Sequence, residues 1–259
     1  MQDGEYIIDR WVVNVIRDIC QTKAISFRAY SDDWLLELES SGTVRRVLGY
    51  RFHLNDSVAS SIAQDKVATY QVLDSAGLPA VQHVLVRTKV SHADQQVMAG
   101  WQNIVIKPLV GTSGHGVRLF EDTELAIQHI EQSSIAAWAA APYVDIKREV
   151  RIIMLDGGVL LAYEKQPVMI RGLKMFNLGL GATPKDIQVS DGVLQLAVDA
   201  QRELGLRLST VDIIENQEGE YKVLEINDSI MMEHYMRRSA AHKERGRTVY
   251  TKIIEAMFE

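Results

Sequence analysis

Apolar residues near the start of the chain recur at helical spacing, and short runs of alternating apolar and polar residues follow them. Trp11, Val12, Val15 and Ile16 share one face of a predicted helix near residues 9–20. Polar turns then separate three predicted strands, at residues 24–30, 34–39 and 43–48. This opening block, residues 1–55, is too short to hold a hydrophobic core alone.

The next part of the chain predicts helices that alternate with short strands. A polar cluster at residues 55–57 is typical of a helix start. Val67, Tyr70 and Leu73 lie on one face of a second helix, which Gly77 would end. Beyond it, the pattern predicts strands at 81–87, 103–107 and 117–120, and helices at 93–99 and 123–132.

The second half of the chain contains two predicted β-hairpins. Their strands span residues 149–155 with 159–165, and 209–216 with 220–227, and a helix at 192–204 lies between the hairpins. Residues 166–188 are predicted to be a loop, and loops longer than ~12–15 residues are usually functional or disordered. The whole pattern predicts an α+β protein with antiparallel hairpins, in two lobes.

Composition excludes several classes of protein. The chain has 259 residues, a net charge of −6 and a single cysteine. A nucleic-acid-binding protein needs a basic surplus, and a disulfide scaffold or a zinc site of several cysteines needs more cysteine. No apolar run approaches the ~18–20 residues of a membrane span, and the first residues are acidic where a secretion signal is basic. We therefore expect a cytoplasmic protein that binds neither nucleic acid nor membrane.

A glycine-rich turn follows the predicted strand that ends at Lys107. The turn contains Gly111, Ser113, Gly114 and Gly116. Glycines allow successive backbone N–H groups to converge on an anion, and the lysine adds a positive charge. The turn lacks the ending of a Walker loop, and a strand is predicted after it instead of a helix, which favours a flap over phosphates. A flexible β-turn beside an edge lysine is the alternative.

The last predicted hairpin carries a cluster of polar residues. With a two-residue turn at Glu218-Gly219, Asp212 lies directly across from Glu225, and Asn227 lies on the same face. Facing carboxylates repel each other unless a positive charge lies between them. Two carboxylates and an amide suit Mg²⁺. The alternative is a solvent-facing acidic ladder, although the apolar neighbours are typical of core strands.

The other hairpin carries Arg151. With Gly157-Gly158 as its turn, Arg151 lies opposite Glu164. The two residues form either an ordinary cross-strand ion pair or an arginine fork that Glu164 holds and presents to a phosphate or carboxylate.

Taken in order, these motifs resemble the ATP-grasp superfamily, and within it the carboxylate–amine ligases: glutathione synthetases, ribosomal-protein glutamate ligases and cyanophycin synthetases. The resemblance runs from about residue 55 to residue 230 and includes Asp65-Lys66, Val105-Ile106-Lys107-Pro108 and Ala141-Pro142-Tyr143-Val144. It implies an α+β ATP-grasp fold, in which two α+β lobes clamp a nucleotide after a short N-terminal α/β segment. The implied boundaries are residues 1–55 for the segment, and 56–140 and 141–259 for the lobes.

The resemblance also implies roles for individual residues. Two would be catalytic, Lys107 at the phosphates and Arg151 at the transferred phosphoryl group. The implied cofactors are ATP and one or two Mg²⁺ ions, with Asp212, Glu225 and Asn227 as the metal ligands. The other nucleotide-binding residues would be Lys66, Val105, Gly111, Ser113, Gly114, Gly116, Pro142, Val144, Glu149 and Leu224.

Five of these residues would surround the nucleoside. The carbonyl of Pro142 and the N–H of Val144 would bind the adenine edge, which a proline at this position permits. Val105 and Leu224 would cover the two faces of the base, and Glu149 would bind the ribose.

Departures from the family's pattern lie on the substrate side. The family usually begins with a larger domain that helps to bind the acceptor. Residues 179–181 are Gly-Leu-Gly where the glutamate ligases have basic residues, and residues 228–232 lack the usual proline turn. The pattern therefore predicts the nucleotide chemistry without naming a substrate.

The favoured function is an ATP- and Mg²⁺-dependent ligase that activates a carboxylate as an acylphosphate and joins it to an amine or a thiol. Two alternatives stay open: an ATP-grasp kinase that phosphorylates a small molecule, and a nucleotide-binding regulatory or partner subunit with little turnover. The expected partners are a small-molecule carboxylate and an amine or peptide. A homodimer or a partner chain that completes the acceptor site is also open.

Overall fold

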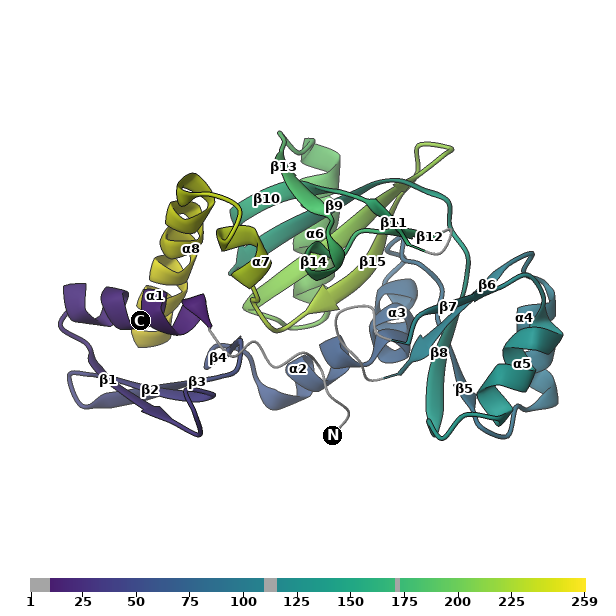
Figure 1. Ribbon diagram of the computed structural model, residues 1–259, viewed down its shortest axis with the longest axis horizontal. Helices are drawn as coiled ribbons and strands as arrows, with labels where there is room; N and C mark the ends of the chain where they lie inside the picture. Colours follow the sequence, from purple (N-terminus) through teal and green to yellow (C-terminus); the bar gives the residue numbers. More distant parts are fainter. Residues whose placement is uncertain (1–9, 110–115, 171–172) are drawn as a thin grey trace.

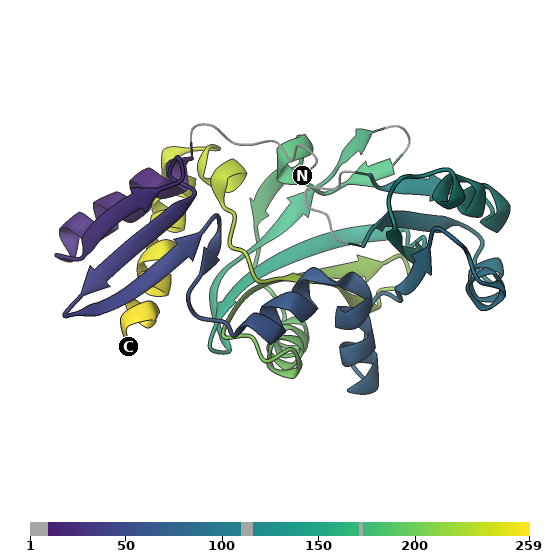
Figure 2. The ribbon, with the colours of Figure 1, turned by 90° about the horizontal axis from the view of Figure 1, so that it is seen from below.

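The structure is a computed structural model, and it describes residues 10–109, 116–170 and 173–259. Within these ranges the strands form three larger sheets and one two-stranded hairpin (Figure 1). Two of the larger sheets lie at opposite ends of the molecule, and the third lies between them, as the view from below also shows (Figure 2). Helices and antiparallel sheets occur together, which confirms the predicted α+β class.

The N-terminal sheet shares its core with helices from both ends of the chain. Its strands are β1 (Ser26–Tyr30), β2 (Leu35–Ser40), β3 (Thr43–Leu48) and β4 (Arg51–Phe52). Helix α1 (Trp11–Thr22) and the C-terminal helix α8 (Ala240–Phe258) pack against it, and Ile16, Leu36 and Ile253 belong to one buried cluster. The opening block therefore completes its core with the end of the chain.

A short helix, α7 (Glu233–Met236), ties these two ends together. The fully buried carboxylate of Glu233 accepts hydrogen bonds of 3.0 Å from the backbone N–H groups of both Trp11 and Val12. The first N–H groups of a helix have no partner within the helix, so this carboxylate caps α1 from a distant part of the sequence.

The sheet at the other end has the strand order β5-β8-β6-β7. These strands are β5 (Val84–Arg87), β8 (Ala137–Pro142), β6 (Ile104–Pro108) and β7 (Arg118–Phe120). Helices α4 (His92–Ala99) and α5 (Thr123–Glu131) cover one face, around the buried side chains of Ile106 and Trp138. Val105 and Lys107 alternate with Ile106 along β6, so they point to the opposite face.

The central sheet has five strands in the order β13-β10-β9-β14-β15. These strands are β13 (Thr183–Asp186), β10 (Gly158–Gln166), β9 (Ile146–Leu155), β14 (Leu208–Asn216) and β15 (Tyr221–Asn227). One face packs on α2 (Ser57–Gln64), α3 (Lys66–Ser75) and α6 (Asp191–Glu203). Val211 belongs to this packed face, so Asp212, the next residue of β14, points to the other.

The register predicted for the β9–β10 hairpin is wrong. Its turn is Asp156-Gly157, with φ of 49° and 77°, and not Gly157-Gly158. The register then shifts between Val159 and Leu161, so that Arg151 pairs with Tyr163 and not with Glu164. On its other side β9 runs beside β14, where Arg151 pairs with Asp212.

The β14–β15 hairpin places Asp212 opposite Glu225, as predicted, by a different route. The N–H of Asn216 donates to the carbonyl of Glu220 at 3.0 Å, so residues 217–219 form a three-residue turn and not the predicted two-residue turn. A register shift between Asp212 and Ile213 compensates for the extra residue. Two departures from the prediction therefore cancel at the acidic pair.

Residues 166–188 were predicted to be a loop, and that prediction is wrong. The described part contains β11 (Val168–Ile170), β12 (Leu173–Met175), a 3-10 turn at Leu178–Leu180 and the edge strand β13. β13 pairs with β10, which lies well before it in the chain. A pairing of this kind leaves no mark in the local sequence pattern. The boundaries predicted at residues 55 and 140 stay predictions.

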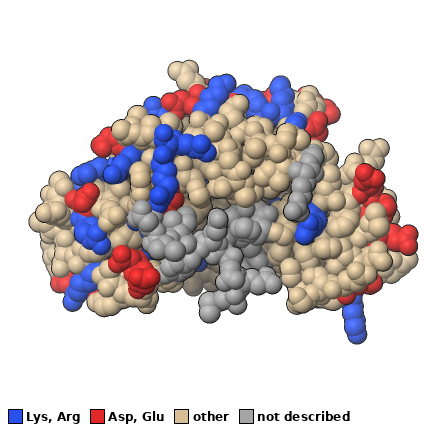
Figure 3. All heavy atoms as spheres, in the orientation of Figure 1, with Lys and Arg blue, Asp and Glu red and all other residues tan. Residues whose placement is uncertain are grey.

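The surface gives two further findings. On the face shown in Figure 3, acidic and basic side chains of the described residues are intermixed, without an extended basic area. Among the described helices, none is both long enough and apolar enough to cross a membrane.

Candidate functional site

A cavity of about 630 Å³ is lined, among others, by residues of the central sheet and of the sheet β5-β8-β6-β7, which is called the four-stranded sheet from here on. Ten of the predicted ligand-binding residues line it: Lys66, Val105, Lys107, Pro142, Val144, Glu149, Arg151, Leu224, Glu225 and Asn227. Gly111, Ser113 and Gly114 of the predicted flap lie outside the described residues. Gly116 has a φ of 75°, and a Cβ atom there would come within 3.0 Å of the Pro108 ring. The backbone conformation of residue 116 and its closeness to Pro108 therefore favour glycine at this position.

The four-stranded sheet contributes the lysine side of the cavity. Lys107 is half-buried near the end of β6, and burial lowers its pKa to about 8. Lys66 is the first residue of α3, and the side chain of Asp65 caps that helix by accepting from the N–H groups of Val67 and Ala68. The cap fixes where α3 begins and therefore where Lys66 enters the cavity.

An apolar slot lies next to these lysines, where the adenine is predicted to bind. Val81, Ala141 and Ile214 form a small buried cluster, against which Val144 and Leu224 pack. The N–H of Tyr143 donates to the carbonyl of Asn103 at 2.9 Å, which continues the pairing of β8 with β6 past Pro142. The segment predicted to bind the adenine edge is thus held to the sheet through its middle residue.

The central sheet contributes a buried network of four charged residues. Asp212, of which 1% is exposed, accepts two hydrogen bonds from Arg151, from Nε at 2.8 Å and from Nη2 at 2.6 Å. Lys165 Nζ lies 2.8 Å from Asp212 Oδ2 and 2.5 Å from Glu149 Oε1. Two carboxylates and two cations therefore neutralise one another on the cavity face of β9, β10 and β14.

The pKa values of the two carboxylates of this network are shifted in opposite directions. Burial alone would raise the pKa of Asp212, but Arg151 and Lys165 outweigh it and hold that pKa far below its usual range. Burial raises the pKa of Glu149, and Lys165 offsets this only in part. Asp212 therefore stays ionised because it is paired on two sides.

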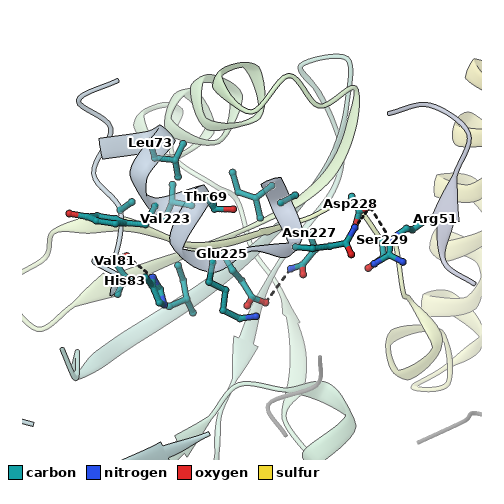
Figure 4. Close-up of a pocket in the computed structure, with 17 residues that line it drawn as sticks. Arg51, Thr69, Leu73, Val81, His83, Val223, Glu225, Asn227, Asp228 and Ser229 are labelled. Atoms are coloured by element: carbon teal, nitrogen blue, oxygen red, sulfur yellow. Dashed lines mark hydrogen bonds and ion pairs between the residues drawn. The ribbon is translucent and has the colours of Figure 1, made fainter. Parts of the chain in front are cut away.

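Glu225 and Asn227 lie on the same face of β15, beside this network. Asn227 Nδ2 donates to Glu225 Oε1 at 3.1 Å, and the Glu225 side chain is 30% exposed (Figure 4). Arg151 Nη2 lies 4.0 Å from Glu225 Oε1. The positive charge expected between Asp212 and Glu225 is therefore present, and it belongs to Arg151.

The donor chemistry of this corner fits a magnesium ion. The carboxylate of Glu225 and the amide oxygen of Asn227 are hard oxygen ligands on a rigid strand, and both residues line the cavity. Asp212 has less capacity left to bind an ion. Arg151 and Lys165 occupy three of about four acceptor positions of its carboxylate, which leaves one at Oδ1. The predicted triad thus consists of two candidate ligands that line the cavity, Glu225 and Asn227, and of Asp212, which also holds the network together.

Lys165, Arg51 and His83 are polar cavity residues that were not among the predicted site residues. Lys165 pairs with Glu149 across β9 and β10, so a correct prediction of this register would have placed Lys165 beside a predicted site residue. Arg51 is held through Nε by Asp228 Oδ2 at 2.9 Å (Figure 4), a contact between segments far apart in the chain. His83 is a buried histidine that directly precedes the apolar run Val84-Leu85-Val86, and its place beside this run was the available signal.

Comparison with known proteins identifies the family. The model of the RimK-like ATP-grasp domain matches residues 63–255. The chain belongs to the RimK-like ATP-grasp family. The resemblance drawn from the motifs is therefore confirmed. The matched range contains Lys66 and Lys107, the segment 141–144 and the β14–β15 hairpin.

Curated relatives of this RimK-like chain carry ligase names. It is 29% identical over 180 residues to a probable alpha-L-glutamate ligase of Shewanella pealeana, a match that covers 68% of this chain and 39% of the relative. It is 24% identical over 228 residues to the glutamate–LysW ligase ArgX of Sulfolobus acidocaldarius, covering 85% of this chain and 74% of that protein. The chain spans less than half the length of the first of these relatives.

Solved structures confirm the ATP-grasp fold. The D-alanine–D-alanine ligase from Bacillus anthracis complexed with ATP matches with a TM-score of 0.61 and 17% identity, over 79% of this chain and 69% of that one. The ATP-grasp ligase PsnB complexed with a minimal precursor, Mg and ADP matches with a TM-score of 0.57 and 23% identity, over 76% and 61% of the two chains.

One substrate-side departure of this RimK-like domain has a structural counterpart. A Cβ atom at Gly179 would lie 2.9 Å from His234 Nε2 and 3.1 Å from Asn177 Oδ1. The imidazole of His234, which comes from α7, thus occupies the space that a side chain at position 179 would need. The Gly-Leu-Gly segment is matched to a histidine from another part of the chain.

Proposed function

We propose that the protein is an ATP- and Mg²⁺-dependent ligase that joins a carboxylate to an amine. The observation that carries the proposal is the arrangement of one cavity. Lys66 and Lys107 line it from α3 and the four-stranded sheet, and Glu225 and Asn227 line it from the central sheet. Cations beside carboxylate and amide oxygens suit a triphosphate that carries a metal ion.

In the first step the cavity residues bind ATP and position it for phosphoryl transfer. Lys66 and Lys107 hold the α- and β-phosphates, and the apolar slot holds the base. A substrate carboxylate oxygen attacks the γ-phosphorus, the bond to the β-phosphate oxygen breaks, and ADP and an acylphosphate form. Arg151, fixed by Asp212, stabilises the negative charge on the transferred group.

The second step needs no side-chain nucleophile. An amine attacks the carbonyl carbon of the acylphosphate, inorganic phosphate leaves, and the amine loses a proton to give the amide. Closure of the cavity excludes water, which would otherwise hydrolyse the acylphosphate.

Magnesium is the remaining part of the proposal. Glu225 and Asn227 would hold it, with Asp212 Oδ1 as a further ligand, and it would neutralise charge on the β- and γ-phosphates. The number of ions, one or two, belongs to the proposal as well.

The relatives' names support a substrate class. They name glutamate and, for ArgX, LysW, and another PsnB structure is a complex with a precursor peptide. We therefore include an amino acid as one substrate and a peptide or protein as the other. A homodimer or a partner chain at the acceptor end stays a prediction, as does a cytoplasmic location.

The test is a single change at the metal corner, Glu225→Gln. We expect ADP formation to fall at least about a hundredfold, because the carboxylate that neutralises the ion is lost. Glu220→Gln, at the exposed residue that follows the turn of the same hairpin, is the matched control and should retain activity. Asp212→Asn is a poorer test, because Asp212 also holds the buried network.

The same assay separates the alternatives. ADP release that requires both a carboxylate and an amine supports the ligase. A phosphorylated product that forms without any amine would replace it with the kinase. Tight ATP binding without turnover on a broad panel of carboxylates and amines would leave the regulatory subunit.

A further inference from the structure

His83 is buried in the cavity wall with one ring nitrogen unsatisfied. Only 2% of the residue is exposed, and Nδ1 lies 2.9 Å from the carbonyl oxygen of Val81 (Figure 4). Nε2 is buried and has no hydrogen-bond partner among the described residues, although the residue lines the cavity. Buried polar atoms are nearly always paired, so this atom lacks a partner that a ligand can supply.

The protonation state of the ring follows from its surroundings. A carbonyl oxygen only accepts, so Nδ1 must carry a proton and donate it to Val81. Burial, with Lys107 and Lys66 nearby, lowers the pKa of His83 to about 3. The imidazole is therefore neutral, and Nε2 presents a lone pair that needs an N–H or O–H donor.

The position of the ring follows from the strand register. Val84, the first residue of β5, pairs with Ala140 of β8, so His83, one residue before the start of β5, comes beside Ala141. On the other side of β8, Ala141 pairs with Val105. His83, Ala141 and Val105 all line the cavity and form one row across the slot predicted to hold the base.

ATP offers few groups that could satisfy this acceptor. Phosphate oxygens accept hydrogen bonds and cannot donate to Nε2. The ribose hydroxyls are predicted to lie at Glu149, which belongs to the other sheet. The remaining donor is the 6-amino group of adenine, which has two hydrogens, and the predicted carbonyl partner at Pro142 uses one of them.

Resting on the proposed function, we infer that His83 is a specificity-determining residue that accepts the second hydrogen of the adenine 6-amino group at Nε2. The base is then read on two sides of the same group, by the backbone at Pro142 and by the side chain of His83. A 6-oxo purine places an acceptor against the lone pair of Nε2, and the site discriminates against it.

The experiment compares the binding of Mg-ATP and Mg-ITP, which differ in the 6-substituent, by titration calorimetry without other substrates. We expect His83→Phe to weaken ATP binding about tenfold, because one hydrogen bond to a buried group is lost. Binding of ITP should stay the same or tighten, because the opposing lone pair is removed. The preference for ATP over ITP should therefore fall at least tenfold in this variant.

Further variants keep the inference open to disproof. His83→Gln retains an acceptor oxygen and should restore much of the preference for ATP. His83→Asn has a shorter side chain that draws the acceptor back, so it should lose the preference for ATP as His83→Phe does. It replaces His83→Phe in the experiment if the phenylalanine variant fails to fold. His129→Phe is the matched control, since His129 packs on Phe120 and Trp138 outside the cavity and should change neither affinity.

The outcomes separate this inference from the proposed function. Equal losses for ATP and ITP in His83→Phe would mean a merely structural role for His83 and would overturn the inference. An unchanged ATP preference would overturn it as well, while the ligase proposal stands. If the wild type binds no nucleotide, both the inference and the proposed function are wrong.

Discussion

Two walls of the cavity, formed by the central sheet and by the four-stranded sheet, differ in whether their buried polar groups are paired. On the central sheet, Asp212, Arg151, Lys165 and Glu149 neutralise one another at distances of 2.5–2.8 Å. On the other wall, His83 Nε2 is buried without a partner among the described residues. Lys107 lies on that wall too, with its pKa lowered by burial.

The difference indicates which wall is complete before a ligand binds. A paired network holds its side chains in place, and the removal of one member leaves charges buried alone. An unpaired buried group raises the free energy of the empty protein and regains a partner only when a ligand arrives. The charged network of the central sheet is therefore fully paired before a ligand binds, whereas the four-stranded sheet has a buried group that gains a partner under the proposed function.

The largest expected effect comes from breaking the paired wall with Asp212→Asn. The amide cannot neutralise Arg151 and Lys165, so the two cations keep only Glu149 at 2.5 Å from Lys165 and Glu225 at 4.0 Å from Arg151. We expect a loss of about 3–5 kcal/mol in the free energy of unfolding. Denaturant titration of the variant and the wild type measures it.

The pH dependence of that loss checks its origin. The pKa of Asp212 is lowered in the folded protein, below its ordinary unfolded value of ~3.9. The stabilisation by this carboxylate is therefore fully present above that value and is lost as the pH falls towards the folded pKa. The gap between wild type and Asp212→Asn should be constant near neutral pH and should narrow below about pH 4. A gap that does not change with pH would mean that the carboxylate charge is not its source.

The next effect concerns Lys107 on the unpaired wall. With a pKa of about 8 in the free protein, Lys107 is mostly charged at pH 7 and mostly neutral at pH 9. Only the cation binds phosphate, so the affinity for Mg-ATP should fall about tenfold between these pH values. Titration calorimetry at several pH values measures it.

An arginine variant provides the control for this prediction. Lys107→Arg stays charged throughout this range, so its affinity for Mg-ATP should be nearly independent of pH. A wild-type affinity that is equally flat would show that Lys107 is not the group that titrates in this range.

Alternation and spacing were enough to predict much of this architecture. The strands at residues 43–48 and 209–216 differ from the observed β3 and β14 by at most one residue at either end. The pairing of Asp212 with Glu225 was also predicted, although the turn length and the register shift that produce it were not. Each of these features depends on neighbours within one strand or one hairpin, where side chains alternate between faces.

The features that were missed depend on contacts between distant segments. The partner of Arg151 is Asp212, on a strand that pairs with the other edge of β9, and a hairpin rule cannot find it. The register shift between Val159 and Leu161 moves every later pair by one residue. His83 Nε2 could be recognised as unpaired only after all of its neighbours were in place.

The smallest expected effect isolates burial as the cause of the difference between the walls. Arg207 binds both oxygens of Asp156, at 2.9 and 2.8 Å, nearly the geometry with which Arg151 binds Asp212. The side chains of Arg207 and Asp156 are 49% and 48% exposed, however, whereas Asp212 is 1% exposed.

Asp156→Asn makes the same chemical change as Asp212→Asn, and asparagine tolerates the φ of 49° at this turn. We expect it to cost about 0.2–1 kcal/mol in the same denaturant titration, because water solvates the arginine that is left. Equal losses in the two variants would show that hydrogen-bond geometry, and not burial, determines how much such a pair contributes to stability.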